Sequence, residues 1–526
     1  MNRKLILLIT LLKYFDLEGQ VNFNILPDVG GIGGQAMSFI AIPDTNSIKI
    51  IGHRFDTILP GSNDKPWLGE FDYSGNIIDI VSFLDSQYTK PFNVFNNPLA
   101  HKEDDIYYYY ARRHVQGTYF TPYLIEFDLS SGEVLRSKLI EYNKDPTLPY
   151  SGTMIRYEKK SNTIVLLNVL HQNDSLVTYI TLLDTLFNIK KVVKVNETHT
   201  DNFPFWCKAN TDSTFIIIGD GLFGEDPLTK YSQIYFTESN VNGQVVQFKL
   251  LPTSINLGFG LPTARTILQL KNGDLVISGL YYDDRSNVCS NCFQLIPYIV
   301  AVSSEFDSLR WQTKFYDIPY SNSEQYFLHS MTLVDDGVIV AGDFLASTSM
   351  QKSGVLFKAS LGGDSLWMKH FIPLDWDSSR VAWVNFNDVQ VSPYGTVIVS
   401  GAIGDLEEQN VRPWILQLDK DGCLVPGCNL VSTEDQSTSG IKKVNFKICP
   451  NPVSEHLYLF STITSTDPVN IQVISNVGSV IKTRQFYPVT GSQYILSCDG
   501  LNAGIYHLVL TCSKTNQVES HAFFVK

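Results

Sequence analysis

Apolar and polar residues alternate in short runs that recur along the chain with a spacing of about 58 residues, the mark of a repeat architecture. Strict alternation sends successive side chains to opposite faces and therefore predicts β-strands. Each run carries a small or turn-prone residue at a corresponding place. The runs are SIKIIGHRF, DIYYYYARR, NTIVLLNVL, STFIIIGDG, GDLVISGLY, DGVIVAGDF and YGTVIVSGA, and the recurring residues are Gly52, Ala111, Asn168, Gly219, Gly279, Gly342 and Gly401.

A second strand-like segment follows each run after a loop of variable length. In four repeats it opens with proline, at Pro66, Pro122, Pro297 and Pro413. The first position of a strand tolerates proline because it need not donate to the ladder. This segment ends in Asp, Ser, Gly or Asn, which predicts a turn, and a further strand follows the turn. One more strand lies before the first run of each repeat. Each repeat is therefore predicted to hold four antiparallel strands.

Seven such repeats predict an all-β fold, a seven-bladed β-propeller in which four-stranded sheets pack around an axis. Burial between neighbouring sheets grows with their number, so about 400 residues need no single oversized core. The recurring glycine is expected where one strand passes too close to adjacent backbone for a side chain. A β-helix is the alternative, but its coils are shorter and its turns more uniform.

The two ends of the repeat region predict how the ring closes. The seventh repeat has no fourth strand, because PWILQLDKDG runs directly into CLVPGC. Residues 20–26, QVNFNIL, have the pattern of a strand but precede the first full repeat. We expect this N-terminal strand to complete the seventh sheet, so that residues 20–428 form one propeller.

Residues 1–19 have the features of a signal peptide. Arg3 and Lys4 precede an apolar run, Leu5 to Leu12, that is too short to span a bilayer. Cleavage is predicted after Gly19, the small residue nearest the right distance. The alternative is a buried N-terminal strand or helix. No transmembrane segment is predicted elsewhere in the chain.

The pattern changes after Cys428. Residues 429–446 are rich in Ser, Thr and Asp and predict a linker. Residues 447–526 return to short alternating runs, which are HLYLFST, VNIQVIS, SVIKTRQF, QYILS, GIYHLVLT and SHAFFVK. About six strands in so short a segment predict a small C-terminal β-sandwich.

Three motifs in this module resemble the type A C-terminal sorting domain of the Bacteroidetes type IX secretion system. They are the start Pro450-Asn451-Pro452, the strand–Asn–x–Gly–strand hairpin at Gly478, and the LNAGIY run with Gly504, Ile505 and Tyr506. Cys449 departs from the family, which usually carries an aromatic residue there. The resemblance implies the type IX secretion machinery as a partner and a secreted or cell-surface location. An ordinary adhesive β-sandwich is the alternative.

The eight cysteines suit an exported protein, in which disulfides persist. Cys289 and Cys292 form one close pair and Cys423 and Cys428 another, and each pair is predicted to staple a loop. A zinc site would need further ligands at suitable spacing, and a thioredoxin-like site would need a strand–CxxC–helix context. The remaining cysteines, whose pairing stays open, are Cys207, Cys449, Cys498 and Cys512.

Composition narrows the class of partner. The 526 residues are 44% hydrophobic, 12% aromatic and 18% charged, which is typical of a globular chain. The formal net charge of -13 repels phosphate backbones, and no basic stripe offsets it. Nucleic acid is therefore not expected as a partner.

No HExxH motif, nucleophile elbow or P-loop is present, so no catalytic residue, cofactor or metal is predicted. We expect a non-enzymatic propeller whose loops bind a glycan, peptide or protein partner. The alternative is a secreted hydrolase of polysaccharide or peptide, which predicts carboxylates at equivalent ends of the innermost strands. Among the positions just after the recurring small residues, two carry a carboxylate. These positions are His53, Arg112, Val169, Asp220, Leu280, Asp343 and Ala402.

Overall fold

The structure is a computed structural model, and its described residues are all-β: they form strands joined by turns and bends, with no helix among them. The described residues are 24–25, 36–55, 64–81, 89–91, 99–115, 119–140, 150–172, 175–195, 202–211, 214–223, 231–251, 264–284, 293–315, 324–346, 351–373, 382–405, 410–424, 446–463, 467–476, 478–489, 491–512 and 518–526.

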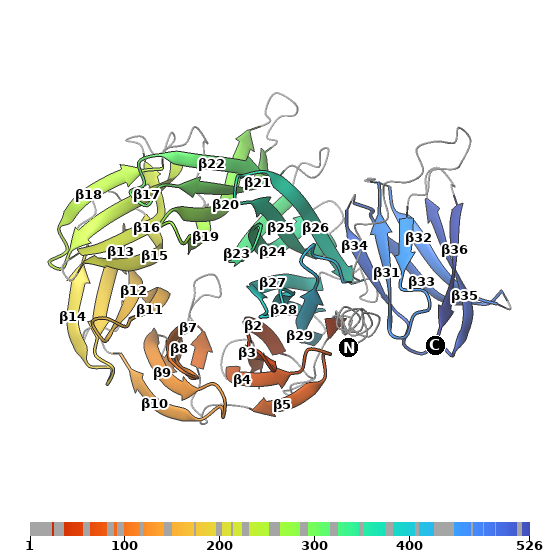
Figure 1. The fold of residues 1–526 in the computed structure, drawn as a ribbon, viewed down its shortest axis with the longest axis horizontal. Helices are drawn as coiled ribbons and strands as arrows, with labels where there is room; N and C mark the ends of the chain where they lie inside the picture. The colour runs from red at the N-terminus through yellow and green to blue at the C-terminus, as the bar shows by residue number, and fades with distance from the viewer. Residues whose placement is uncertain are drawn as a thin grey trace, which may run out of the picture.

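Antiparallel sheets follow one another along the chain and lie around a ring (Figure 1). The first contains β2 (Ala36–Pro43), β3 (Ile48–Phe55), β4 (Asp64–Phe71) and β5 (Ile77–Val81). The second contains β6 (Thr89–Pro91), β7 (Leu99–Glu103), β8 (Ile106–Val115), β9 (Tyr119–Asp128) and β10 (Val134–Leu139). The next two contain β11 (Tyr150–Glu158), β12 (Thr163–Gln172), β13 (Ser175–Leu183) and β14 (Ile189–Lys194), then β15 (Asn202–Thr211), β16 (Thr214–Phe223), β17 (Tyr231–Asn240) and β18 (Val245–Leu250).

The later sheets of the ring repeat this order. They contain β19 (Ala264–Gln269), β20 (Leu275–Asp284), β21 (Phe293–Val302) and β22 (Leu309–Lys314), then β23 (Glu324–Val334), β24 (Gly337–Ala346), β25 (Gln351–Ser360) and β26 (Ser365–Pro373), then β27 (Ala382–Val391), β28 (Val397–Asp405) and β29 (Asn410–Leu418). In Figure 1 the strands β2, β7, β11, β15, β19, β23 and β27 lie nearest the centre of the ring.

The last sheet of the ring takes its fourth strand from the start of the chain. The strand β1 (Asn24–Ile25) pairs antiparallel with β29, with Asn24 opposite Leu416 and Ile25 opposite Ile415. Residues Ile50 and Trp67 of the first sheet share a buried cluster with Ile398 and Ile415 of this last sheet. The two ends of the ring therefore meet through both backbone pairing and a common core.

The recurring small residues lie opposite a β-bulge in the innermost strand. In six sheets, one residue of the innermost strand pairs with the small residue. The register shifts immediately after that pair, so the innermost strand holds one extra residue there. The pairs before the shift are Ser38–Gly52, Gly152–Asn168, Pro204–Gly219, Ala264–Gly279, Leu328–Gly342 and Phe386–Gly401. A Cβ atom on Gly342 would lie 2.0 Å from the Phe327 carbonyl oxygen, which confirms the predicted close approach.

Outer strands are tied to the next sheet by a recurring hydrogen bond. A side chain of the outermost strand donates to the last hairpin turn of the following sheet, and in most cases the donor is a lysine Nζ. The bonds run from Lys138 to Asn188 Oδ1 (2.9 Å), Lys191 to Asn242 Oδ1 (3.2 Å), Lys249 to the Glu305 carbonyl (2.6 Å), Thr313 to the Gly363 carbonyl, and Lys369 to the Asp421 carbonyl (2.6 Å).

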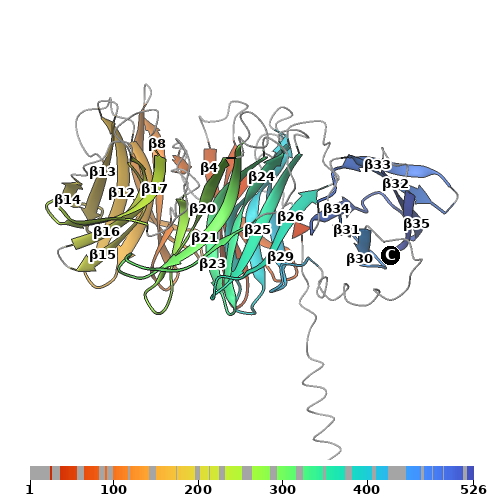
Figure 2. The same ribbon diagram turned by 90° about the horizontal axis from the view of Figure 1, so that it is seen from above.

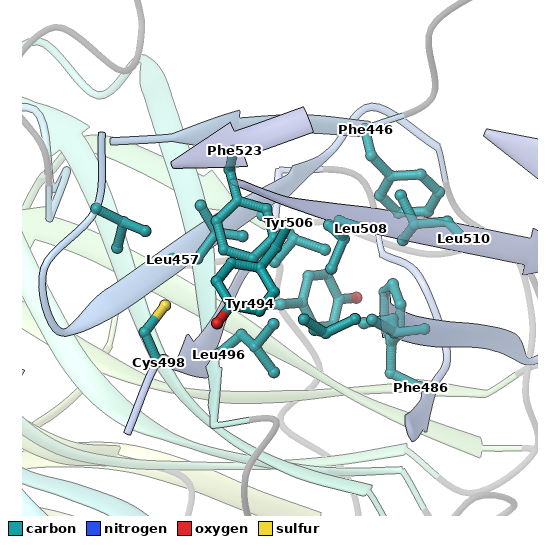
Figure 3. Packing of buried hydrophobic residues seen from close by; sticks show 14 of the residues in the cluster. Phe446, Leu457, Phe486, Tyr494, Leu496, Cys498, Tyr506, Leu508, Leu510 and Phe523 are labelled. Carbon is teal, nitrogen blue, oxygen red and sulfur yellow. The ribbon is translucent and has the colours of Figure 1, made fainter. Parts of the chain in front are cut away.

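The C-terminal module holds two sheets that enclose one core. The first contains β30 (Phe446–Cys449), β31 (His456–Ser461) and β34 (Gln493–Ser497). The second contains β33 (Val480–Phe486), β32 (Val469–Ser475), β35 (Gly504–Cys512) and β36 (Val518–Val525). Figure 3 shows Leu457 and Leu496 of the first sheet beside Tyr506 and Phe523 of the second.

Candidate functional site

The positions that follow the recurring small residues lie on the second strand of each sheet. His53 is on β3, Asp220 on β16 and Asp343 on β24, whereas the innermost strands are β2, β15 and β23. The expectation that these positions mark the ends of the innermost strands is therefore wrong. The small residue lies on the second strand, opposite the bulge of the innermost strand. The residue that follows it therefore lies on the second strand as well.

The polar side chains near these positions contact one another inside the ring. The Asp343 carboxylate contacts Nε2 of His329, the extra residue at the β23 bulge, and the His329 side chain is 4% exposed. Nε2 of His53 lies 2.9 Å from the Tyr109 hydroxyl of the second sheet. Asp220 is also buried. The Asp343–His329 contact connects two strands of one sheet, and the His53–Tyr109 contact connects two sheets.

A buried carboxylate joins three sheets where the ring closes. Asp388 of β27 accepts a hydrogen bond from Ser330 Oγ of β23 at 2.6 Å and one from the Ala41 backbone N–H of β2 at 3.0 Å. Gln390 Nε2 donates to the same carboxylate at 3.1 Å. Burial raises the pKa of Asp388, while these hydrogen bonds favour its ionised form.

A groove of about 510 Å³ lies between the β19–β22 sheet and the β23–β26 sheet. Its walls come from the hairpin turn that joins β19 to β20, from β21 and β22, and from the end of β23 and two turns of the next sheet. The main lining residues are Leu270, Asn272, Asp274, Arg310, Trp311, Leu333, Asp335 and Leu361. No sequence motif pointed to these residues, because they come together only when two repeats pack side by side. The groove is the candidate ligand site of the described ring.

Polar groups at the rim of this groove are fixed in place. The Arg310 guanidinium donates to both Asp274 carboxylate oxygens, from Nε to Oδ2 at 3.2 Å and from Nη2 to Oδ1 at 3.4 Å. Asn272 Nδ2 donates to Asp274 Oδ2 at 2.9 Å, and the Asp274 backbone N–H donates to Asn272 Oδ1 at 3.0 Å. Two-point pairing of this kind orders the arginine more than a single contact would.

Of the cysteines predicted to pair, only Cys423 lies within the described residues. It is fully buried, and Lys369 Nζ lies 3.1 Å from its sulfur. Cys289, Cys292 and Cys428 fall outside the described residues, so both predicted pairings stay predictions. The predicted signal peptide, residues 1–19, falls outside them as well. Burial raises the pKa of the Cys207 thiol to about 12 and that of Cys449 to about 11.

The sorting-domain motifs occupy defined places in the C-terminal module. In the Pro450-Asn451-Pro452 segment, the Asn451 side chain accepts from the Phe524 N–H at 2.9 Å and donates to the Ala522 carbonyl at 3.1 Å. The segment is thereby fixed to β36. Gly478 sits at a turn with a φ of 84°, and Gly504, Ile505 and Tyr506 begin β35. Tyr506 packs into the core while Ile505 points outward, 53% exposed.

The C-terminal module continues one sheet of the ring. The outermost strand β26 pairs in parallel with β34, with Phe371 opposite Gln493 and Pro373 opposite Ile495. Figure 1 and Figure 2 show the two strands side by side. The Gln493 side chain is fully buried, donates to the Gly422 carbonyl at 3.0 Å and accepts from the Leu424 N–H at 3.4 Å. We call this contact the β26–β34 seam.

Apolar packing reinforces the seam. Tyr458 and Ile495 of the C-terminal module belong to the same buried cluster as Phe371, Phe386 and Trp414 of the ring. A sheet edge that would otherwise be open to solvent is therefore covered by backbone pairing and side chains together.

Within the described ranges, His, Cys, Asp and Glu side chains form no group of three or more that could hold a metal ion. That same part of the chain contains no helix with the length and apolarity needed to cross a bilayer.

Comparison with known proteins identifies the C-terminal module. Residues 447–524 match the model of the secretion system C-terminal sorting domain, which confirms the resemblance found in the sequence. A search of curated proteins finds no match to the chain.

Several solved structures are similar to the chain at low identity. One is the β-propeller domain of the Trilobed protease from Pyrococcus furiosus, 8% identical with a TM-score of 0.38, over 73% of this chain and 95% of that one. Another is Drosophila Semaphorin 2a, 7% identical with a TM-score of 0.40, over 96% and 97%. A third is PorZ of Porphyromonas gingivalis, a surface component of the type IX secretion system, 7% identical with a TM-score of 0.21, over 96% and 100%.

The family match and the position of the three motifs lead to one conclusion about this chain. Residues 447–524 form a type IX secretion sorting domain, and the protein that carries it is secreted to the cell surface or the extracellular space.

Proposed function

We propose that this chain is an exported, non-enzymatic binding protein. Residues 1–19 are its signal peptide, residues 20–428 a seven-bladed β-propeller closed by the N-terminal strand, residues 429–446 a linker, and residues 447–526 a β-sandwich that directs secretion. Outside the cell the propeller binds a glycan, peptide or protein partner.

The observation that carries this proposal is the groove between the β19–β22 and β23–β26 sheets. It combines an aromatic wall at Trp311 with polar groups held in place by the Arg310–Asp274 pair. A concave site with apolar walls and a few oriented polar groups is the usual form of a ligand site. The sorting domain supports an extracellular place for the ligand.

Two carboxylates of the ring, the buried Asp388 and the partly buried Asp343, support binding over hydrolysis. Asp388 accepts from Ser330, Ala41 and Gln390, and Asp343 contacts His329. A hydrolase needs carboxyl groups that face its substrate and can exchange protons with it. These two carboxylates instead hold sheets and strands together.

The test is to incubate the purified chain with immobilised glycans, peptides and extracellular proteins, and in parallel with soluble polysaccharide and protein substrates. We expect retention of a ligand with no release of cleaved product. Turnover in the second arm contradicts the non-enzymatic proposal and favours the hydrolase. Failure to retain any glycan, peptide or extracellular protein contradicts the binding proposal.

A further inference from the structure

We propose that the groove between the β19–β22 and β23–β26 sheets is a binding site for an uncharged saccharide. This inference rests on the proposed binding function and names its ligand class and its site. The argument uses the aromatic wall, the polar rim and the balance of charge, each from described residues.

The aromatic wall is Trp311, which is held rigidly by the neighbouring sheet. The backbone of Gly363 lies so close that a Cβ atom there would be 2.7 Å from Trp311 Cβ. Thr313, two residues along β22, donates to the Gly363 carbonyl and fixes the same approach. A ring that is already immobile loses little conformational entropy when a ligand packs against it. Trp311 therefore offers a preorganised flat apolar surface.

An exposed aliphatic side chain extends this surface. Leu361, in the turn between β25 and β26, is 45% exposed and lines the groove together with Leu270 and Leu333. A pyranose ring has C–H groups on one face and hydroxyl groups around its edge. An apolar wall with polar groups beside it matches both parts of such a ligand.

The rim supplies hydrogen-bonding groups in fixed directions. The Arg310 side chain is 50% exposed while its partner Asp274 is 14% exposed, so the guanidinium is anchored on one side and open on the other. Asn272, which is bonded to the same carboxylate, lies in the turn next to it. Planar donors and acceptors held side by side can pair with neighbouring hydroxyl groups of a sugar.

The charges of the groove balance. Lys271 and Arg310 bring two positive charges, and Asp274 and Asp335 bring two negative charges. A site for phosphate or for an acidic sugar would need an excess of positive charge to repay desolvation of the anion. The equal numbers favour a ligand that is polar and uncharged.

A peptide ligand fits these observations less well. Extended peptides are usually held by main-chain pairing to a free strand edge. The edge strand β22 contributes only two adjacent residues to the lining, Arg310 and Trp311, whereas six lining residues lie in turns, so the groove does not run along a strand edge. A neutral saccharide is therefore the ligand that the groove favours.

The test uses the full chain and a panel of soluble neutral oligosaccharides built from glucose, mannose, galactose or N-acetylglucosamine. Glucuronic-acid oligosaccharides and a peptide pool serve as the other arms, and binding is followed by titration calorimetry. We expect a neutral oligosaccharide to bind, and Leu361→Arg to weaken it by about tenfold or more, as expected when a ligand loses its apolar contact. Arg310→Gln should also weaken binding, because it removes the anchored guanidinium.

Leu366→Arg is the matched control, because Leu366 is 44% exposed on β26 and does not line the groove. It should leave affinity within about twofold of the unaltered chain. Binding of the peptide pool or acidic sugars alone overturns the saccharide inference but leaves the proposed binding function standing. Neutral-sugar binding that Leu361→Arg and Arg310→Gln leave unchanged overturns the site. Cleavage of the sugar contradicts the non-enzymatic function instead.

Discussion

At the scale of single residues, buried polar side chains connect parts of the ring that are distant in the sequence. Asp388 bonds to Ala41, and the two are 347 positions apart. Alternation of apolar and polar residues could predict that Asp388 lies in a strand. It could not predict the partner, because the contact exists only once the first and last sheets of the ring meet. The Arg310–Asp274 pair is unpredictable for a similar reason, since it links the two ends of one sheet unit.

Asp388→Ala should destabilise the fold strongly. The change leaves the buried Ser330 hydroxyl and Ala41 N–H without their acceptor, and an unsatisfied buried donor costs about 1–3 kcal/mol. We expect the free energy of unfolding, measured with urea, to fall by roughly 3 kcal/mol. Asp79→Ala, at an exposed position of β5, should change it by less than about 0.5 kcal/mol. Equal effects of the two variants would show that the three-sheet contact contributes no stability.

Lys369 should give the ring a pH-dependent stability. Burial lowers the pKa of Lys369 from 10.5 to about 8. Between these two pH values the unfolded chain keeps the proton and the folded chain has lost it, so the free energy of unfolding rises with pH. The free energy of unfolding can be measured with urea at about pH 7.5 and at about pH 9.5. Its increase between the two should be larger for the unaltered chain than for Lys369→Met.

The matched control for this comparison is Lys159→Met, because Lys159 is exposed in a turn. The free energy of unfolding of Lys159→Met should change with pH as that of the unaltered chain does. If the free energy of unfolding of Lys369→Met rose with pH as steeply as that of the unaltered chain, the Lys369 ammonium would not be desolvated at this site.

At the scale of the elements, the repeat was predictable because strand alternation and turn residues are local features. The sequence also indicated that the recurring glycines mark a close approach between strands. It did not indicate which strand is innermost, since all strands of a repeat alternate in the same way. The bulge opposite Gly342 explains the error: the glycine belongs to β24, and the irregular strand is its neighbour β23.

Gly342→Ala should disturb the β23–β24 pairing. The new Cβ would lie 2.0 Å from the Phe327 carbonyl oxygen, so backbone must move to accommodate it. Overpacking of this kind should lower the free energy of unfolding by about 3 kcal/mol. Gly362→Ala is the control, because its Cβ would come no closer than 3.6 Å to a neighbouring atom. Thermal unfolding followed by circular dichroism compares the stability of the two variants. If Gly342→Ala were as stable as Gly362→Ala, the β23 backbone would not be too close to Gly342 for a side chain.

At the scale of the whole molecule, the sequence predicted two modules and a polar linker, and it identified the sorting domain from three motifs. A linker suggests that the second module moves independently. The β26–β34 seam has the opposite consequence, because backbone pairing and a shared apolar cluster fix the sorting domain against the ring. Nothing local in residues 371–373 or 493–495 encodes this pairing. It depends on two strand edges that become neighbours only after both modules have folded.

Gln493→Glu should open the seam at neutral pH. The buried amide of Gln493 donates to the Gly422 carbonyl, and a carboxylate in its place would put two acceptors face to face. We expect amide hydrogen exchange at Phe371 and Ile372 of β26 to accelerate by about tenfold or more, while exchange in β18 stays unchanged. Gln485→Glu adds the same charge at an exposed position of β33 and should leave both strands unchanged. A protonated carboxyl at position 493 can again donate to the Gly422 carbonyl. Acidification should therefore slow amide exchange in β26 of Gln493→Glu more than it changes exchange in Gln485→Glu. Fast exchange at Phe371 and Ile372 in the unaltered chain would mean instead that the sorting domain is not held at the seam.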